Sequence, residues 1–255
     1  MPHSNELQIV LIASKSQISP DDKKELVYLV SQGVNWALLF SWSRAHKVSS
    51  RVYDNLKSVF NDAIPSEIDE KQRELTRQHF IKSVVMMKLL FAVMDLLTEE
   101  NVFCIPYKGP VLAILLYGDV SKRSYGDLDI LISREDFPLV YKILIENDFS
   151  PEFRINFSQL VSYSSVEDNF SFVDDRGAVI EVHWELSGRY LRKPLNLEFI
   201  RDKLTHICVN KRQLAVFSNE DLLIYLCLHG TKHYWQQLDL ICSVAELINQ
   251  STRMD

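Results

Sequence analysis

The stretch KGPVLAILLYGDVSKRSYGDLDILI, residues 108–132, ends in Asp127-Leu128-Asp129 followed by three apolar residues. Side chains alternate between the two faces of a strand, so Asp127 and Asp129 are predicted to project from the same face, about 7 Å apart. Carboxylates that close repel each other unless a cation lies between them, and Mg²⁺ is the usual occupant of an all-oxygen site. The alternative is that Asp127 caps the turn after Gly126 and Asp129 faces solvent.

The same stretch begins with a lysine and a glycine in a position suited to anion binding. Lys108 and Gly109 follow a strand-like apolar run at residues 102–105 and precede an apolar segment, residues 110–117, that is predicted to be a helix. A glycine there lets backbone N–H groups approach a phosphate, and the helix N-terminus adds a partial positive charge. Lys108 adds a full charge for the same anion. The pattern favours a phosphate site beside the two aspartates.

A second predicted strand carries further ionisable groups. Residues 178–186 alternate, which places Glu181, His183 and Glu185 on one face and apolar side chains, including Trp184, on the other. The same pattern also fits an amphipathic edge strand whose acidic face is solvated, so the spacing alone leaves both interpretations open.

Three separated motifs resemble a known family. They are Lys-Gly with the later Leu-Tyr-Gly-Asp, Arg123 and Gly-Asp-Leu-Asp-Ile-Leu-Ile, then Glu-Val-His-Trp at 181–184, and Leu-His-Gly-Thr-Lys-His-Tyr-Trp at 228–235. In this order they resemble the polymerase-β-type nucleotidyltransferase superfamily, and more narrowly its bacterial branch labelled "uncharacterised nucleotidyltransferase". That branch carries Lys-Gly where the superfamily usually has glycine-serine. The resemblance covers residues 34–247.

The resemblance implies an enzyme that moves a nucleotidyl group from an NTP such as ATP to an acceptor hydroxyl, with one or two Mg²⁺ ions. The acceptor would be a small molecule, a sugar, a protein or a tRNA end. The resemblance selects Glu181 as the third carboxylate, with Glu185 as the fallback. The implied catalytic metal ligands are Asp127, Asp129 and Glu181; the implied nucleotide-binding residues are Lys108, Gly109, Arg123 and Lys232; and the residues implied to orient them or contact the acceptor are His183, His229, His233 and Trp235. Arg123 fits equally well as a structural partner of Asp119 or Asp127.

The periodicity along the chain predicts an α+β fold. An N-terminal helical region, residues 1–100, precedes a nucleotidyltransferase core with a small mixed sheet, residues 101–193, and a mostly helical C-terminal region, residues 194–255. Helix signals such as Ser19-Pro20 and Asn35 predict helices over residues 20–31, 35–46, 49–60, 65–100, 110–117 and 133–148. Predicted strands cover residues 102–105, 128–132, 166–173, 178–186, 205–209 and 213–217. A helix is predicted to end at His229-Gly230, and a last one to cover residues 231–249.

Composition and charge narrow the function. With 47% hydrophobic and 24% charged residues, the chain is typical of a globular protein. Its net charge of −6 argues against general nucleic-acid binding, because an acidic surface repels a phosphate backbone. Four dispersed cysteines and the lack of a bilayer-length apolar stretch predict a cytoplasmic protein that does not enter a membrane. Relatives usually continue with further helices, so we expect a truncated or short member.

Two histidines of the third motif also suggest a metal site of another kind. His229 and His233 stand four residues apart, a spacing that suits zinc on one helical face. However, Gly230 is expected to interrupt the helix, and no glutamate follows His229. A catalytically inactive nucleotide-binding or interaction module on the same fold is the main alternative, and a structural partner in a larger assembly is another. The three intact carboxylates favour the active enzyme.

Overall fold

The computed structural model describes residues 5–60, 63–186 and 195–251, and its fold is α+β, as the sequence predicts. The chain divides into two compact units. The first consists of Met1–Ser83, Ala113–Ser124 and His229–Asp255, and the second of Val84–Leu112 and Tyr125–Leu228. Because both units combine distant parts of the sequence, the three consecutive regions given above remain a prediction about domain boundaries.

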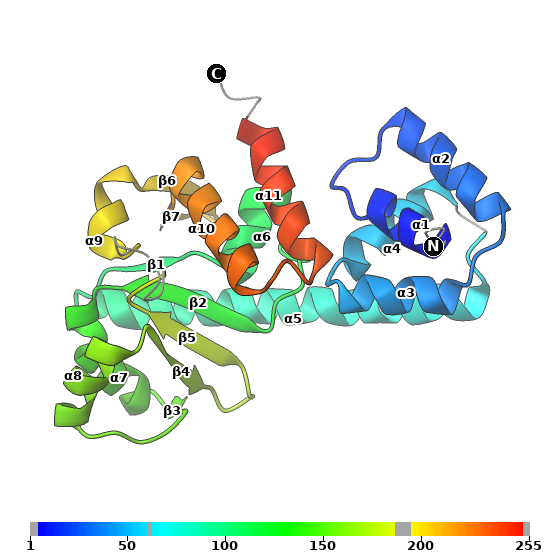
Figure 1. Ribbon diagram of the computed structural model, residues 1–255. Helices are drawn as coiled ribbons and strands as arrows, with labels where there is room; N and C mark the ends of the chain where they lie inside the picture. The colour runs from blue at the N-terminus through cyan, green and yellow to red at the C-terminus, as the bar shows by residue number, and fades with distance from the viewer. Residues whose placement is uncertain (1–4, 61–62, 187–194, 252–255) are drawn as a thin grey trace. The chain divides into compact units, whose positions relative to one another are not determined.

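The first unit is helical (Figure 1). Its elements are α1 (Asn5–Ala13), α2 (Pro20–Ser31), α3 (Trp36–Ala45), α4 (Ser49–Val59), the first part of α5 (Ser66–Glu99), and α11 (Leu238–Ser251). The helices α1 to α4 share a core in which Ile9, Leu26 and Leu39 have no accessible surface. Ile68 of α5 and Leu238 of α11 pack against this core. The apolar run within α1 is therefore a core element of this unit.

Local hydrogen bonds explain where two of these helices begin. The Ser19 hydroxyl accepts from the Asp22 N–H at 3.1 Å, while the Asp22 carboxylate accepts from the Ser19 N–H at 3.0 Å, and Pro20 occupies the first helical position. The Asn35 side chain accepts from the Leu38 N–H at 3.0 Å. Such caps satisfy N–H groups that have no partner inside the helix. The predicted starts of α2 and α3 are confirmed.

A buried charge network connects distant segments of the first unit. Arg51 donates to the Ser14 carbonyl at 3.0 Å, to the Lys122 carbonyl at 2.8 Å and to the Asp239 carboxylate at 3.1 Å. The Nε atom of Arg123 lies 3.1 Å from the second oxygen of Asp239. Arg51, Arg123 and Asp239 are all buried, so two guanidinium groups share the single negative charge of Asp239 away from water.

The second unit is built on a five-stranded mixed sheet (Figure 1). In spatial order its strands are β1 (Cys104–Pro106), β2 (Asp127–Ile132), β5 (Val179–His183), β4 (Asn169–Val173) and β3 (Ser150–Pro151). The central strands β2 and β5 are parallel, and the other neighbours are antiparallel. Parallel neighbours need a crossover connection. Here α7 (Phe137–Glu146) and α8 (Phe157–Val166) lie in that connection.

The helices α7 and α8 cover one face of the sheet (Figure 1). The ring of Phe137 on α7 lies 4.4 Å from the ring of Trp184, and Tyr163 on α8 lies 5.4 Å from Phe170 of β4, measured between ring centroids. Residues Ile180 and Val182 of β5 are fully buried. Their neighbours along the strand therefore point to the opposite face, which confirms the predicted alternation.

The second unit also contains a separate hairpin. The strands β6 (Thr205–Val209) and β7 (Arg212–Val216) are antiparallel, and the two turn residues Asn210 and Lys211 have φ of 51° and 67°. Positive φ at both central residues matches the twist of a tight hairpin. The short α9 (Leu197–Ile200) precedes this hairpin, and α10 (Asn219–Lys232) follows it, with residues up to Leu228 in this unit.

Several predicted boundaries were wrong. The helix α8 was not predicted, because its sequence FSQLVSYSSV lacks a clear apolar period, although the Asn156–Gln159 capping box marks its start. Because α8 extends to Val166, β4 begins at residue 169 instead of 166. The strand β5 is also shorter than predicted and ends at residue 183 instead of 186. The strand β1 covers residues 104–106 instead of 102–105.

The expectation that Gly230 interrupts a helix was also wrong. The helix α10 continues through Gly230 to Lys232, and α11 begins at Leu238 instead of residue 231. A helix tolerates a single glycine at a cost of about 1 kcal/mol. The break falls later, at Tyr234 and Trp235, which have φ of 53° and 54°. Trp235 then folds back onto Gly230, where an added Cβ would lie 2.4 Å from the indole ring.

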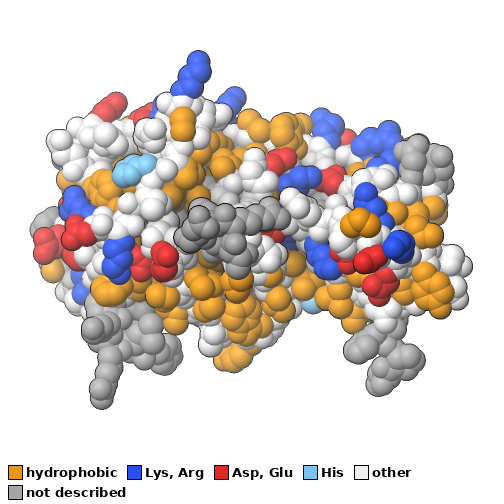
Figure 2. Space-filling view, turned by 90° about the horizontal axis from the view of Figure 1, so that it is seen from above, with side chains coloured by type: hydrophobic (Ala, Val, Ile, Leu, Met, Phe, Trp, Pro, Cys, Tyr) orange, Lys and Arg blue, Asp and Glu red, His pale blue; other side chains and the backbone are white. Residues whose placement is uncertain are grey.

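Charged side chains of both signs are interspersed on the face shown in Figure 2, with hydrophobic side chains between them. In the described part of the chain, the helices fall short of the combined length and apolarity that crossing a bilayer requires.

Candidate active site

The pairing of β2 with β5 assembles the predicted carboxylates. In the parallel register Asp129 lies opposite Glu181, Asp127 opposite Val179, and Leu131 opposite His183. Because side chains two residues apart share a face, Asp127 and Asp129 of β2 and Glu181 and His183 of β5 belong to the face turned away from α7 and α8. Neighbouring strands lie about 5 Å apart, so these groups are close in space.

Asp129 is the most buried member of the group. Its side chain has no accessible surface, and its Oδ1 atom accepts from Lys108 Nζ at 2.7 Å and from the Tyr107 hydroxyl at 3.4 Å. The His183 Nε2 atom lies 3.2 Å from the same oxygen. The other oxygen, Oδ2, is buried and has no hydrogen-bond partner. Burial raises the pKa of Asp129, but the charge of Lys108 and the hydrogen bond with His183 outweigh it and hold the pKa below its usual value.

Glu181 and His183 complete a compact set of potential ligands. The His183 Nε2 atom lies 3.1 Å from Glu181 Oε2 and thus bridges the two carboxylates. Each of Asp129, Glu181 and His183 offers one potential ligand atom, and these three atoms all lie within 4.8 Å of one another. Burial lowers the pKa of His183, but its hydrogen bonds to Asp129 and Glu181 raise it more, so the pKa lies above its usual value. The sequence had assigned His183 a supporting role, and the structure brings it into contact with both acids.

Asp127 lies at the edge of this cluster. It is half-buried at the start of β2 and is not one of the three residues whose ligand atoms meet. Burial raises the pKa of Asp127, and the negative charges of Asp129 and Glu181 raise it further. An additional cation near these acids would reverse that effect. Its role as a metal ligand stays a prediction.

Lys108 and Gly109 lie beside the acids at the start of α6 (Gly109–Tyr117). Burial lowers the pKa of Lys108, but the neighbouring Tyr225 hydroxyl and the Asp129 carboxylate raise it above the usual value. Gly109 has φ of 53°, and a Cβ at this position would lie 3.2 Å from the Asp127 carbonyl oxygen. Glycine is therefore favoured here for both its backbone conformation and its close contact with β2.

An aromatic cluster supports the lysine, and the sequence analysis missed it. Tyr107 stacks on Phe217, with ring centroids 5.6 Å apart, and meets Tyr225 of α10 edge-on at 5.1 Å. Tyr107 also contacts the ring of His183 edge-on at 5.6 Å. A tyrosine directly before the Lys-Gly pair was the one local signal, whereas Phe217 and Tyr225 reach the site only through the tertiary fold.

The other predicted site residues belong to the first unit. Arg123 pairs with Asp239, a partner that neither structural alternative in the sequence analysis had named. The rings of His229 and His233 contact each other at 4.5 Å. Among the described residues, the one set of three or more potential metal ligands is that of Asp129, Glu181 and His183, so the zinc interpretation of the histidine pair gains no third ligand. The nucleotide and acceptor roles of these residues, Lys232 and Trp235 included, stay predictions.

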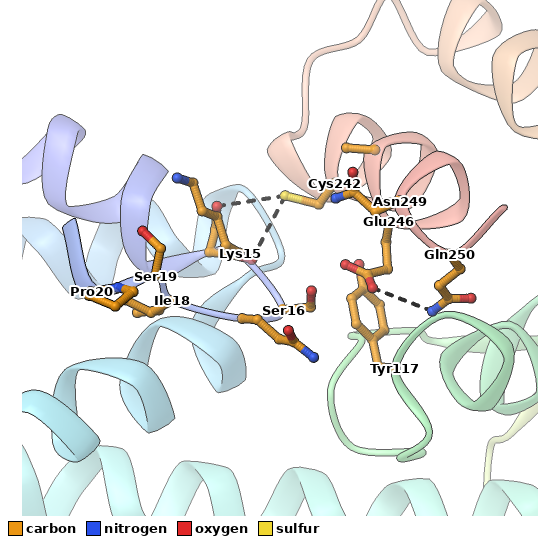
Figure 3. A pocket seen from close by; sticks show the side chains of 13 residues that line it. Lys15, Ser16, Ile18, Ser19, Pro20, Tyr117, Cys242, Glu246, Asn249 and Gln250 are labelled. Carbon is orange, nitrogen blue, oxygen red and sulfur yellow. Dashed lines mark hydrogen bonds between the residues drawn. The ribbon is translucent and has the colours of Figure 1, made fainter. Parts of the chain in front are cut away.

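The first unit also contains a hollow of about 750 Å³ (Figure 3). It lies between the segment 14–20 and α11, and Tyr117 forms part of its wall. Gln250, one of the lining residues, donates to the Leu116 carbonyl at 2.5 Å and to Glu246 at 3.4 Å. The side chains that line the hollow include none of the predicted site residues.

Comparison with known proteins identifies the class of protein. A family model described as "Uncharacterised nucleotidyltransferase" matches residues 32–255. The protein is a nucleotidyltransferase, an enzyme whose fold places acids on adjacent strands beside a lysine-glycine helix start. Since the match spans most of its length, the chain belongs to the uncharacterised nucleotidyltransferase family.

Solved structures of other nucleotidyltransferase-like proteins are similar to parts of this chain. The lincosamide antibiotic adenylyltransferase LnuA, solved with lincomycin bound, is 14% identical, with a TM-score of 0.43 over 63% of this chain and 94% of that one. An antigenic nucleotidyltransferase-like protein from Paracoccidioides brasiliensis is 17% identical, with a TM-score of 0.39 over 68% of this chain and 75% of that one. The comparison with curated proteins found no match.

Proposed function

We propose that this nucleotidyltransferase depends on Mg²⁺ and transfers a nucleotidyl group from an NTP to the hydroxyl of an acceptor. The observation that carries the proposal is the meeting of Asp129, Glu181 and His183 on one sheet face, with Lys108 and Gly109 beside them. The acceptor classes are those given above: a small molecule, a sugar, a protein or a tRNA end. The four cysteines lie far apart in the sequence and form no Cys-x-x-Cys pair, which supports a cytoplasmic location.

The residues present fit a divalent cation. Asp129 Oδ2 is a buried oxygen without a hydrogen-bond partner, and a buried acceptor left unsatisfied is costly unless a ligand completes it. Burial raises the pKa of Asp127, and the negative charges of Asp129 and Glu181 raise it further, so a cation would favour the ionised carboxylate; oxygen ligands suit Mg²⁺. Asp129, Glu181 and Asp127 would hold the ion. When bound, a divalent cation supplies positive charge that stabilises the phosphates and lowers the pKa of the attacking hydroxyl.

The remaining steps fall to the protein's own side chains. Lys108 and the N–H groups at the start of α6 would bind the triphosphate, because a helix N-terminus and an ammonium both attract anions. The Glu181 side chain is 27% exposed, which makes it more accessible to an acceptor than Asp129 or His183. It would accept the hydroxyl proton while the oxygen attacks the α-phosphorus and the bond to the β-phosphate breaks, which releases pyrophosphate. His183, 3.1 Å away, would hold the Glu181 carboxylate in position.

One observation favours the alternative of a nucleotide-binding module without turnover. The Lys108 ammonium already lies 2.7 Å from Asp129, so a cation is present in the site without any metal. A module of this kind would bind an NTP without Mg²⁺ and transfer nothing. The alternative therefore differs from the enzyme in two measurable properties.

The test combines binding with turnover. Thermal shifts are measured for the four NTPs with and without Mg²⁺, on the wild type, Asp129→Asn and Glu181→Gln. A matched control is Asp175→Asn, because the Asp175 side chain is 79% exposed in a turn of the same unit. We expect at least one NTP to stabilise the wild type and the control only with Mg²⁺, and both site variants to lose that shift.

Turnover is followed as pyrophosphate release from the NTP that binds, with pools of small molecules, sugars, proteins and tRNA offered as acceptors. Mg²⁺-dependent release that Glu181→Gln abolishes supports the enzyme. Equal NTP shifts in all variants, with and without Mg²⁺, and no pyrophosphate release would favour the binding module.

A further inference from the structure

Lys108 is held in a closely fitted environment before any ligand arrives. Its side chain is 16% exposed, and its Nζ atom donates to Asp129 Oδ1 at 2.7 Å. The same Nζ atom lies 5.6 Å from the centroid of the Tyr107 ring and 5.9 Å from that of Tyr225. An ammonium attracted to a carboxylate and to aromatic faces is well stabilised in a partly desolvated site. The resting partner of Lys108 is thus Asp129.

This contact conflicts with the two tasks that the proposed function gives these residues. Asp129 is to bind a divalent cation, but its Oδ1 atom already contacts Lys108, His183 and Tyr107. Lys108 is to bind phosphate, but its ammonium faces a carboxylate. A metal ion bound through the partnerless Oδ2 atom would face the ammonium on Oδ1 across the same buried carboxylate, and two cations that close repel each other strongly in a site of low dielectric constant.

We propose that Lys108 is an internal cation that occupies Asp129 until a divalent metal ion displaces it. The released ammonium then becomes available for the phosphates of the NTP. The lysine side chain has four flexible methylene groups, which allow this movement. The exchange is non-covalent, so no covalent bond is made or broken. The inference rests on the proposed function, because it requires Asp129 to be a metal ligand.

The exchange also predicts how metal binding and NTP binding affect each other. Without metal, Lys108 provides a full positive charge beside the buried Asp129 carboxylate, in addition to the contact with His183, and so stabilises the metal-free site. Metal binding breaks the contact between Lys108 and Asp129, which is unfavourable. NTP binding then gives the Lys108 ammonium a new anionic partner in the phosphates. Metal and NTP should therefore strengthen each other's binding, since each removes a cost that the other would meet.

The first test measures the solvent access of Lys108 in the wild-type protein. The protein is treated briefly with sulfo-NHS acetate, and acetylation is quantified by mass spectrometry with no metal, with Mg²⁺ or Mn²⁺, and with metal plus the NTP that binds. Lys142 on α7 is the internal control, because its side chain is 67% exposed in the same unit. We expect metal to raise Lys108 acetylation several-fold, NTP to reverse the rise, and Lys142 to react equally throughout. In Asp129→Asn, Lys108 should react readily with and without metal.

The second test is calorimetric titration of Mg²⁺ and Mn²⁺ into the wild type, Lys108→Met, Lys142→Met and Asp129→Asn. Removal of the internal competitor should make Lys108→Met bind metal more tightly than the wild type and Lys142→Met. Metal binding that Asp129→Asn abolishes, together with unchanged Lys108 acetylation, would overturn the exchange and leave the proposed function intact. No metal binding to the wild type or to Lys108→Met would overturn the proposed function itself.

Discussion

Replacing Arg123 with methionine separates two roles for this side chain, phosphate binding and structural pairing. Its Nε atom lies 3.1 Å from Asp239 Oδ2, and both side chains are buried. The Nε–H group is not aligned for a hydrogen bond, so the contact is an ion pair. In Arg123→Met, Asp239 loses one cationic partner but still pairs with Arg51 at 3.1 Å, so its charge stays compensated. We therefore expect the free energy of unfolding to fall by only about 1–3 kcal/mol.

Replacing Asp239 with asparagine should cost more. Two buried guanidinium groups then lose their shared counter-charge, and removing one partner of a buried ion pair costs about 3–5 kcal/mol. Arg51 retains the carbonyls of Ser14 and Lys122, which favours the lower end of that range. The double variant Arg123→Met/Asp239→Asn should lose less than the sum of the two, because the unpaired Arg123 charge is gone.

The assay is urea unfolding followed by tryptophan fluorescence, with Mg²⁺–NTP thermal shifts measured on the same samples. Arg44→Met serves as the control, because Arg44 is exposed on α3 and its loss should change stability by no more than about 0.5 kcal/mol. An Arg123→Met protein as stable as Arg44→Met that no longer responds to Mg²⁺–NTP would refute the structural role and assign Arg123 to the nucleotide.

Three further predictions concern His183, Gly230 and Cys104. The pKa of His183 is raised because hydrogen bonds to Asp129 and Glu181 outweigh burial, so its stabilising effect is full below pH 6.5 and is lost as the pH rises through the raised pKa. In metal-free urea unfolding, the stability difference between the wild type and His183→Gln should therefore be larger at about pH 5.5 than at about pH 9, and an equal difference would contradict the protonated bridge. Gly230→Ala should destabilise the protein by about 1–3 kcal/mol in spite of the better helix propensity of alanine, since its Cβ would lie 2.4 Å from the Trp235 ring; adding Trp235→Leu should restore stability if that clash is the cause. Burial raises the pKa of the Cys104 thiol to about 12, so maleimide should label the exposed Cys208 and leave native Cys104 unlabelled until urea unfolds the chain, and rapid labelling of Cys104 in the native protein would disprove its burial.

Local patterns in the sequence determined much of the candidate site. The two-residue period of β2 put Asp127 and Asp129 on one face, and the same period in β5 put Glu181 and His183 on one face, because strand geometry depends only on neighbours along the chain. The caps at Ser19 and Asn35 likewise determined two helix starts, through hydrogen bonds between residues three positions apart in the sequence.

Only the tertiary structure decided which of these faces meet. The register that sets Asp129 opposite Glu181 depends on a parallel pairing across the α7–α8 connection, and a shift of one residue would have turned Glu181 away. The contact of Lys108 with Asp129, the aromatic support from Phe217 and Tyr225, and the pairing of Arg123 with Asp239 likewise join residues far apart in the chain. Periodicity describes one element at a time, whereas such contacts arise when separate elements pack, and no local spacing contains that information.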